Sequence, residues 1–408
     1  MTSRPWILAS GTALAALVGR DGSVCWQLAR VAAVAILTVA SVTAAARLGD
    51  RGRGRMACSI GVVVVAVGAG FLPFLVKDAA SIEAPAGLVA VVAGVGLVAT
   101  GTLLRTRGRR RLRKIAAGTG MLVVTALVAL VVSPAVLATN VPRPGVGATP
   151  ASRGLEFETV TVTTQDGVDL AGWYLPSANR AAVVLLHGAG STRSNVLDEA
   201  AVLARHEFGV LLLDARGHGD SEGRAMDFGW NGDADIEAAT TFLAGREDVD
   251  PARIGAVGSS MGAEEAIGAS GTNEVLRAVV AEGATARVAS DEAWLSERHG
   301  LRGRFQEQLE RAQDWVIDAL TSAHVPGSLR SAVARAVGTR YLLITAGTVA
   351  EERHAAAFIA SAAPARVDRW EVDGASHTAG LAVAPAEWEA RVIDFLTEVL
   401  DPVASRAS

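Results

Sequence analysis

Long apolar segments within the first 140 residues limit what this chain can fold into. A helix that spans a membrane needs about 20 mostly apolar residues, and segments near that length lie at 26–46, 59–76, 86–104 and 115–139. We therefore expect residues 1–140 to form an all-α transmembrane region. A shorter apolar segment, 5–19, spans only if the bilayer thins locally, so the expected number of helices is four to five.

Charge is distributed unevenly along the chain. Residues 1–140 carry 15 Lys/Arg and 4 Asp/Glu, whereas residues 141–408 carry 23 and 38. The basic residues of the first region gather in two loops, at 47–55 and 105–114. Because loops rich in Lys and Arg stay in the cytoplasm, we expect a multi-pass protein of the cell membrane. The chain after residue 140 should then lie on the extracytoplasmic side.

The composition excludes several kinds of site. Cys25 and Cys58 both fall in the first third of the chain, so the remainder has no thiol for a nucleophile, a disulfide or a zinc site. The remainder is also acidic and has no basic patch interleaved with aromatic residues, which argues against a nucleic-acid partner. The apolar segments have no Asp, Glu or His in their central turns, so a transport pathway has no groups to use.

A different pattern follows a linker at 141–154 that is rich in Pro, Gly and small polar residues. Alternation of apolar and polar residues around Asp166-Gly167 predicts a hairpin. Short apolar runs (AAVVLLH, GVLLLD, RIGAVG and LRAVVAEG) then alternate with helical patterns, which indicates strands paired in parallel through right-handed crossovers. We predict a doubly wound, mostly parallel α/β sheet over about 155–403, with a mostly helical insertion at about 284–339.

The segment GSSMG fits the motif GxSxG with Ser260 at its centre. In this motif a strand turns sharply into a helix, so the central residue is strained and its neighbours must be small. The segment follows an apolar run and precedes a helical pattern, which is the context that the motif requires. Ser260 is therefore the candidate nucleophile, whereas Ser259 should face away. The spacing does not fit the GxGxxG of a dinucleotide loop.

A serine becomes a nucleophile when a nearby base accepts its proton. His377 follows the last predicted strand, where the carboxyl ends of the strands converge, and is the candidate base. An acidic residue should orient this histidine and stabilise its charged form. Glu351 is the first choice and Glu352 the alternative, because both follow the preceding strand; Glu282 and Asp291 are further alternatives. Acidic residues at a helix N-terminus are also favoured by the helix dipole alone.

Backbone N–H groups near Ser260 can hold the negative charge that develops on a carbonyl oxygen. The loop HGAG follows the first predicted parallel strand. We expect the N–H of Ala189 in this loop to form an oxyanion hole with the N–H of Met261. Gly188 should lie beside the substrate pocket, and His187 should be structural.

The motifs LLHGAG, LLLDARGHGDSEG, GSSMG and GASHT occur in the order typical of the α/β-hydrolase superfamily, and residues from about 155 to 400 resemble it. The resemblance implies a serine hydrolase of the esterase/lipase or serine-aminopeptidase type, without a metal or organic cofactor. Many relatives place an Asp three residues after the glycine that ends the seventh strand, but that position here is Ala350. The chain therefore departs from the superfamily pattern at the position of the acidic residue.

The resemblance also assigns roles to two other parts of the chain. The segment 214–221 resembles a loop that shapes the fold and the pocket, which makes His218 structural. The insertion at 284–339 resembles a lid between the sixth and seventh strands. Within it, Trp294 or Trp315 could line an acyl pocket, and a plain core role is the alternative for both.

These observations predict a membrane-anchored serine hydrolase that cleaves carboxylic esters or related acyl bonds through an acyl-enzyme. Its partners would be a small-molecule or lipid-like acyl substrate and the lipid bilayer. Two alternatives stay open: a serine peptidase or acyltransferase with the same residues, and a catalytically silent hydrolase-like domain that binds a ligand. Substrate choice lies in the lid and pocket, so the sequence does not set the acyl length.

Overall fold

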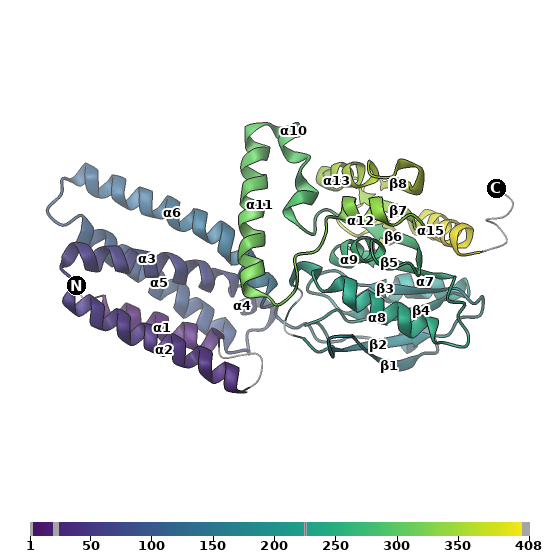
Figure 1. The fold of residues 1–408 in the computed structure, drawn as a ribbon, viewed down its shortest axis with the longest axis horizontal. Coiled ribbons are helices and arrows are strands. Elements are labelled where there is room, and N and C mark those ends of the chain that lie inside the picture. The colour runs from purple at the N-terminus through teal and green to yellow at the C-terminus, as the bar shows by residue number, and fades with distance from the viewer. Residues whose placement is uncertain (1–2, 19–23, 224, 226, 402–408) are drawn as a thin grey trace. The chain divides into compact units, whose positions relative to one another are not determined.

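The computed structural model describes residues 3–18, 24–223, 225 and 227–401. The chain divides into two compact units. The first comprises Met1–Pro142 with Trp315–Leu320, and the second comprises Arg143–Asp314 with Thr321–Ser408. The N-terminal unit is helical, and the second unit combines a sheet with helices (Figure 1).

The first unit is built from apolar helices. Its helices are α1 Arg4–Val18, α2 Val24–Arg47, α3 Asp50–Gly70, α4 Phe74–Lys77, α5 Glu83–Arg105 and α6 Arg111–Ala138. Among the described residues, four segments are long and apolar enough to cross a membrane: Gln27–Arg47, Asp50–Lys77, Glu83–Arg105 and Arg111–Ala138. The four predicted apolar helices are thus confirmed, and the short first segment forms α1, a helix of 15 residues.

The predicted basic loop at 47–55 is shorter than expected. Helix α2 ends at Arg47 and α3 begins at Asp50, so most arginines of this segment lie on the first turns of α3. Arginine is a good helix former. An arginine-rich segment therefore continues a helix as readily as it connects two, and the charge pattern alone did not place this boundary.

Helices α3 and α5 pack closely at glycines. A Cβ atom added to Gly61 would lie 2.7 Å from the carbonyl oxygen of Gly94, and one added to Gly101 would lie 2.7 Å from the carbonyl oxygen of Gly54. No side chain fits at such distances. The glycines therefore allow the two backbones to approach, as small residues do between membrane helices.

The second unit is organised around an eight-stranded sheet. Its strands are β1 Glu158–Thr163, β2 Asp169–Leu175, β3 Ala182–Leu186, β4 Gly209–Leu213, β5 Ile254–Ser259, β6 Leu276–Glu282, β7 Arg340–Ala346 and β8 Val367–Val372. They are ordered β1-β2-β4-β3-β5-β6-β7-β8. Strands β1 and β2 form the predicted antiparallel hairpin, and β2 is also antiparallel to its other neighbour, β4, while strands β3 to β8 pair in parallel. The predicted mostly parallel, doubly wound sheet is confirmed.

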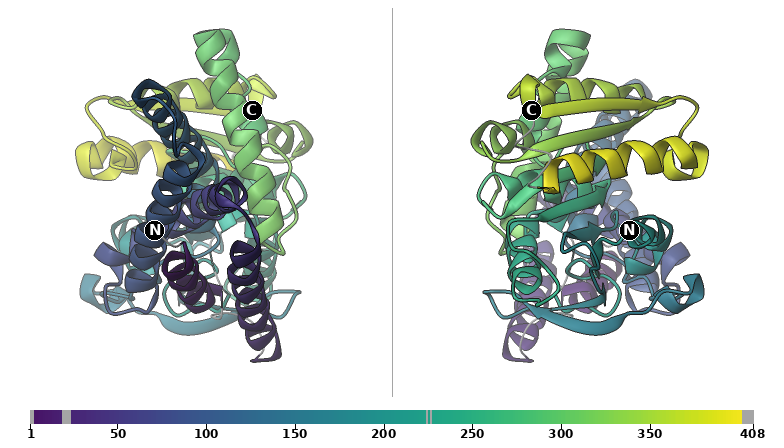
Figure 2. Two further views of the ribbon diagram at one scale, coloured as in Figure 1. Left: turned by 90° about the vertical axis from the view of Figure 1, so that its left-hand side faces the viewer. Right: turned by 90° about the vertical axis from the view of Figure 1, so that its right-hand side faces the viewer.

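Helices cover both faces of this sheet. They are α7 Leu197–Arg205, α8 Gly232–Ala244, α9 Met261–Ser270, α12 Leu329–Arg335, α13 Ala350–Ala360, α14 Gly380–Val383 and α15 Pro385–Leu400. Residues of α8, α9, α12 and α13 form one buried apolar cluster with the sheet, and residues of α7 and α15 form the other. Helix α15 lies alongside the strands in the right-hand view of Figure 2. The core is thus layered, and the carboxyl ends of the parallel strands meet at one edge.

The chain between β6 and β7 is helical, as predicted. It contains a short 3-10 helix, Ala289–Glu292, and helices α10 Leu295–His299, α11 Leu301–Leu320 and α12. Asp291 is fully buried and accepts hydrogen bonds from the N–H groups of Arg287, Val288 and Leu329. This candidate acid therefore joins the start of the insertion to α12.

Candidate active site

Ser260 lies at a strained turn between β5 and α9. Its backbone angles, φ 53° and ψ −121°, fall in a region that residues with side chains rarely adopt. A Cβ atom on Gly258 would lie 2.3 Å from the carbonyl oxygen of Gly262, and one on Gly262 would lie 2.7 Å from that of His187. The two glycines of the motif are therefore required for the turn that presents Ser260.

His377 lies beside Ser260 although 117 residues separate them in the chain. The Nε2 atom of His377 is 2.9 Å from the Oγ atom of Ser260. The histidine belongs to the loop after β8, where the next residue, Thr378, has a φ of 54°. A Cβ atom on Gly283 would lie 2.9 Å from Cε1 of His377. The imidazole ring thus rests against the backbone that follows β6, which fixes its position.

The acidic partner of His377 is Glu352. The Nδ1 atom of His377 is 2.7 Å from Oε1 of Glu352, and the other oxygen of this buried carboxylate accepts the N–H of Ala346 at 2.8 Å. Glu351, the first choice from the sequence, is exposed instead. Helix α13 begins at Ala350, and consecutive helical residues point about 100° apart. Only Glu352 is therefore directed inward, so the structure places the alternative acid beside His377.

The hydrogen bonds set the protonation of His377. The Glu352 carboxylate raises the pKa of His377, and partial burial opposes this effect. Because a carboxylate only accepts hydrogen bonds, Nδ1 must carry the proton. Nε2 is then left to accept the hydroxyl proton of Ser260, which is the arrangement that proton transfer from the serine requires.

Glu282, another candidate acid, joins the two halves of the site. Its carbonyl oxygen accepts the N–H of Ser260 at 2.8 Å. Its carboxylate accepts the N–H of Gly380 at 2.7 Å and the indole N–H of Trp388 at 3.0 Å. Burial raises the pKa of Glu282. No motif indicated this role, in which the residue that ends β6 holds the turn of Ser260 and the loop after His377 together.

The loop after β3 supplies the other side of the site. A Cβ atom on Gly188 would lie 3.2 Å from Cβ of Ser260, so these residues are in direct contact. Ala189 follows and is exposed, while Met261 is the first residue of α9. Among the described residues, the N–H groups of Ala189 and Met261 have no hydrogen-bond acceptor. Both groups are therefore available to a ligand.

Two buried histidines hold this loop, as expected from the sequence. Nε2 of His187 accepts the N–H of Ala215, and Nε2 of His218 accepts the N–H of Gly190, each at 3.0 Å. Burial lowers the pKa of His187 to about 3, with a further contribution from His218. His187 is therefore neutral, and both rings act as fixed acceptors that set the conformation of the loop.

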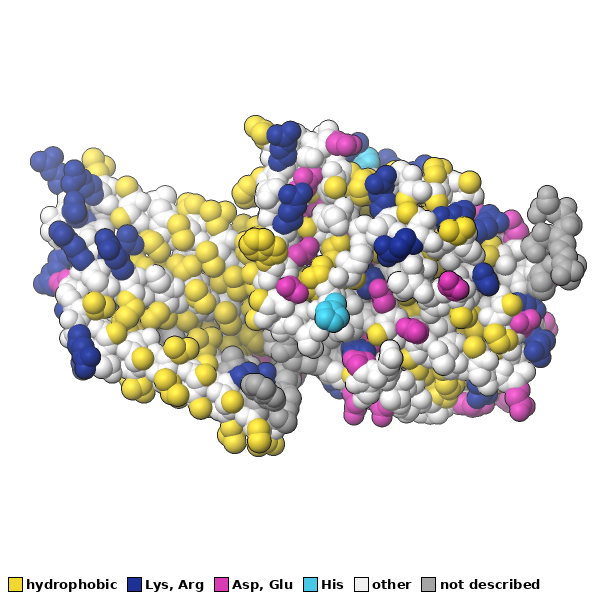
Figure 3. Space-filling view, in the orientation of Figure 1, with side chains coloured by type: hydrophobic (Ala, Val, Ile, Leu, Met, Phe, Trp, Pro, Cys, Tyr) yellow, Lys and Arg dark blue, Asp and Glu magenta, His cyan; other side chains and the backbone are white. Residues whose placement is uncertain are grey.

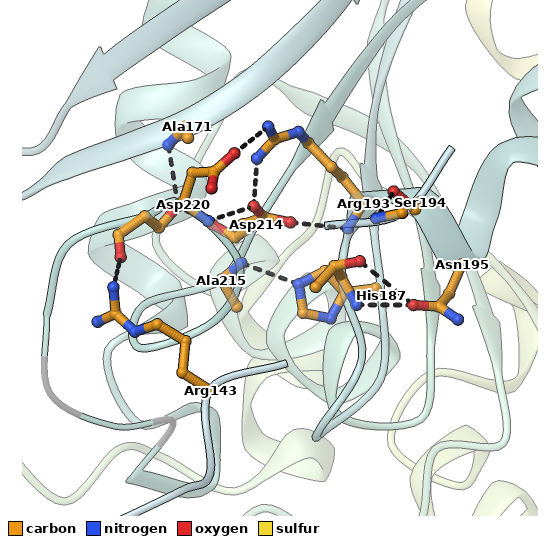
Figure 4. Close-up of polar contacts among 12 residues, drawn as sticks. Arg143, Ala171, His187, Arg193, Ser194, Asn195, Asp214, Ala215 and Asp220 are labelled. Atoms are coloured by element: carbon orange, nitrogen blue, oxygen red, sulfur yellow. Dashed lines mark hydrogen bonds and ion pairs between the residues drawn. The ribbon is translucent and has the colours of Figure 1, made fainter. Parts of the chain in front are cut away.

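A buried ion pair lies next to the same loop (Figure 4). The guanidinium of Arg193 pairs with the fully buried carboxylate of Asp214 and with Asp220. Asp214 also accepts the backbone N–H groups of Arg193 and Asp220, at 2.8 and 2.9 Å. Arg193 in turn lies 4.4 Å above the ring of Trp173. The loops after β3 and β4 are thus joined by charge-assisted hydrogen bonds in the interior.

A comparison with solved structures identifies this architecture. An esterase of Pyrococcus furiosus superposes with a TM-score of 0.51 at 23% identity, covering 64% of this chain and 98% of the esterase. The second unit has the α/β-hydrolase fold, and we call it the hydrolase domain. The match covers nearly the whole esterase, so the helices of the first unit are an addition to this fold.

Sequence comparisons match the middle of the hydrolase domain. Residues 177–332 match the family described as serine aminopeptidase, S33. An uncharacterised protein of Mycobacterium tuberculosis is 42% identical over 112 residues, which are 27% of this chain and 39% of that protein. A thiohydrolase of Aspergillus aculeatus is 34% identical over 133 residues, which are 30% of this chain and 40% of the thiohydrolase. The chain thus spans about two fifths of the length of these relatives.

The two tryptophans proposed for an acyl pocket are in different surroundings. In the hydrolase domain, Trp294 lines a cavity of about 660 Å³ with Arg298, Arg330 and His354. Its ring centroid is 5.5 Å from that of His354. Trp315 is 82% exposed and belongs to the other unit. The residues that line this cavity include Trp294 and do not include Trp315.

Proposed function

We propose that the hydrolase domain is a serine esterase in which Ser260, His377 and Glu352 form the catalytic triad. The observation that supports it most is the continuous chain of contacts from Ser260 Oγ to His377 at 2.9 Å and from His377 to Glu352 at 2.7 Å. These are hydrogen-bond distances between nucleophile, base and orienting acid, the geometry by which such triads are recognised.

The proposed reaction passes through an acyl-enzyme. Oγ of Ser260 attacks the ester carbonyl carbon while Nε2 of His377 takes the hydroxyl proton. The N–H groups of Ala189 and Met261 hold the resulting oxyanion. The carbon–oxygen bond to the leaving group then breaks, and His377 returns the proton to the departing alkoxide. Water then attacks the acyl-enzyme while His377 takes a proton from it. The bond to Oγ of Ser260 breaks, His377 returns the proton to that oxygen, and the carboxylic acid is released.

Glu352 contributes through His377 in this proposal. Its buried carboxylate holds the ring with Nε2 toward the serine, and it stabilises the imidazolium that forms during each proton transfer. The N–H of Ala346 fixes the carboxylate in turn. None of these steps uses a metal or an organic cofactor.

A fluorophosphonate probe tests the serine assignment. We expect the probe to label the full-length protein and a Ser259→Ala control, because Ser259 ends β5 and is not in the chain of contacts. The Ser260→Ala variant should not be labelled. Equal labelling of Ser260→Ala, or no labelling of the unaltered protein, would contradict the assignment and favour a silent binding domain.

A serine peptidase or acyltransferase is the second candidate, and the match to the family described as serine aminopeptidase favours the peptidase. A panel of carboxylic esters of increasing acyl length, one thioester and one aminoacyl amide separates these activities. We expect the highest kcat/KM for an ester. A higher kcat/KM for the amide would replace esterase by peptidase, with the same triad.

We also propose that the four long apolar helices span the cell membrane, with the basic ends of α3 and α6 in the cytoplasm. Helix α6 then runs outward, and the hydrolase domain acts on the extracytoplasmic side. Cys25 is exposed, whereas Cys58 is buried and cannot report sidedness. In intact cells, an impermeant maleimide should label Cys25 and should not label a thiol introduced by Arg107→Cys. The reverse pattern would place the hydrolase domain in the cytoplasm.

A further inference from the structure

Two cavities adjoin each other between α5 and α6. Each has a volume of about 450 Å³. Thr102 of α5 and Met121 of α6 line both of them, so the two cavities are neighbours, and we call them together the α5–α6 cleft. All of its lining residues belong to the N-terminal unit, so the cleft is a property of the helices alone.

The two halves of the cleft differ in chemistry. One half is lined mainly by aliphatic side chains, such as Val98 and Leu122. The other half is lined by Arg105, Arg109 and Arg113. Among the described residues, none of these three arginines forms a salt bridge. The cleft thus has a mainly apolar half next to a half that carries three arginines without a salt bridge among the described residues.

The cleft exists because α6 is packed at only one end. A Cβ atom on Gly70 would lie 2.7 Å from the side chain of Val136, so the C-terminal part of α6 touches α3. Added Cβ atoms on Gly118 and Gly120 would meet nothing within 4 Å. The most apolar window of α6 is 17% buried, against 44% for the segment that contains α3. The N-terminal half of α6 therefore stands away from its neighbours.

The surface of the N-terminal unit, like the cleft, is basic at one end and apolar beyond it. Basic side chains gather at the end where α5 meets α6, and hydrophobic side chains cover much of the helical surface beyond them (Figure 3). Leu103, Leu122 and Val124 are all exposed there. An occupant must therefore be apolar over most of its length and negatively charged at one end.

We propose that the α5–α6 cleft binds an anionic phospholipid, with its phosphate among Arg105, Arg109 and Arg113 and an acyl chain along Val98 and Leu122. Guanidinium groups bind phosphate with directed, charge-assisted hydrogen bonds, and basic pockets between membrane helices bind anionic headgroups. The acyl chain fills space that no side chain occupies. This proposal depends on the membrane location of the helices and does not depend on the esterase activity.

Lipid binding is measured with the full-length protein in mild detergent. Phosphatidylglycerol is the probe, with phosphatidylcholine as the neutral lipid and glycerol 3-phosphate as the headgroup without chains. Native mass spectrometry measures retained lipid, and thermal unfolding measures stabilisation, since a ligand that binds the folded state raises Tm. We expect phosphatidylglycerol to be retained most strongly and glycerol 3-phosphate to have no effect.

Charge-matched variants locate the site. Arg109→Gln/Arg113→Gln should lower the affinity for phosphatidylglycerol by about tenfold or more. Arg51→Gln/Arg55→Gln removes the same charge from exposed positions on α3 and should leave the affinity unchanged. Gly118→Leu should reduce retention of both lipids by filling the apolar half, and it should not weaken α6, because leucine is a better helix former than glycine.

Three results would overturn the proposal. Equal retention of phosphatidylglycerol and phosphatidylcholine would show that the arginines recognise no headgroup. An equal loss of affinity for phosphatidylglycerol in Arg109→Gln/Arg113→Gln and in Arg51→Gln/Arg55→Gln would show that the lipid is attracted by net charge and has no defined site. Stabilisation by glycerol 3-phosphate alone would show a phosphate site without a lipid. Carbonate extraction of each variant separates these results from a failure of membrane insertion.

Discussion

The helical unit and the hydrolase domain hold their interiors together by different means. In the helical unit, α3 and α5 meet at glycines such as Gly61 and Gly94, where the backbones are nearly in contact. In the hydrolase domain, buried charges such as those of Arg193 and Asp214 are paired between loops. Close packing fixes a distance between helices, whereas paired charges and directed hydrogen bonds fix the orientation of particular groups. The second kind of order includes the hydrogen bonds of Ser260 and His377, where a reaction would need it.

If this comparison is correct, the largest effect follows from removing the charge that orients His377. Glu352→Gln keeps the size of the side chain but removes its negative charge and favours the wrong ring tautomer. We expect kcat for ester hydrolysis to fall by about 10⁴-fold. Glu351→Gln is the matched control on the exposed side of α13 and should keep nearly full activity. A larger loss in the control would restore Glu351 as the catalytic acid.

The next effect tests whether the buried ion pair stabilises the fold. Arg193→Met leaves the Asp214 carboxylate buried without its cationic partner, and we expect the free energy of unfolding to fall by about 3–5 kcal/mol. The control is Arg205→Met, which removes the surface pair with Glu389 and should change stability by less than about 1 kcal/mol. Unfolding is followed by loss of fluorophosphonate labelling on heating. If both variants lost labelling at similar midpoint temperatures, the buried ion pair would stabilise the hydrolase domain no more than the surface pair does.

A smaller effect is expected from the glycine contacts of the helical unit. A Cβ atom on Gly94 would lie 2.8 Å from the backbone nitrogen of Val65, so Gly94→Leu must push α3 and α5 apart. We expect a loss of about 1–3 kcal/mol in the stability of the helices, measured by far-UV circular dichroism in increasing SDS. Gly118→Leu, on the open face of α6, should cause no loss. Equal losses would show that glycine itself, and not close packing, matters at these positions.

The sequence predicted most of this architecture, and its errors have physical causes. Alternating apolar runs predicted the parallel sheet, and the constraint of GxSxG located Ser260, because only small neighbours permit that turn. The choice between Glu351 and Glu352 depended on the rotation of α13 about its axis, which a shift of one residue changes by about 100°. The side-chain contacts of Glu282 join residues about 100 positions apart and were not predicted, because no motif marks Gly380 or Trp388 as its partners.

The open side of α6 was also beyond the sequence. Its apolar composition is like that of the other long helices, and nothing in the residue pattern states which faces find a neighbour. Gly118 resembles Gly94 in sequence, yet one faces open space and the other a packed helix. Trp315 illustrates the same limit, because its helix was predicted but its exposure was not.

The smallest expected effect is a shift of the acidic limb of the pH profile of kcat/KM. His377 accepts a proton from Ser260 only while its ring is neutral, so kcat/KM should fall as the pH drops through the pKa of His377. The carboxylate of Glu352 raises this pKa, because it stabilises the charged ring. The acidic limb of the pH profile should therefore lie above the pKa of about 6.5 that is usual for histidine.

The Glu352→Gln variant isolates the cause of that displacement. Its residual activity should have an acidic limb at lower pH than the unaltered protein, since an amide does not stabilise the imidazolium. Glu351→Gln should leave the limb in place, because Glu351 is exposed and does not contact His377. If the limb kept its position in Glu352→Gln, the raised pKa would have to come from other carboxylates near the ring, such as that of Glu264. Glu352 would then orient the ring of His377 without setting its pKa. The difference between the two units would in that case be one of geometry and not of charge.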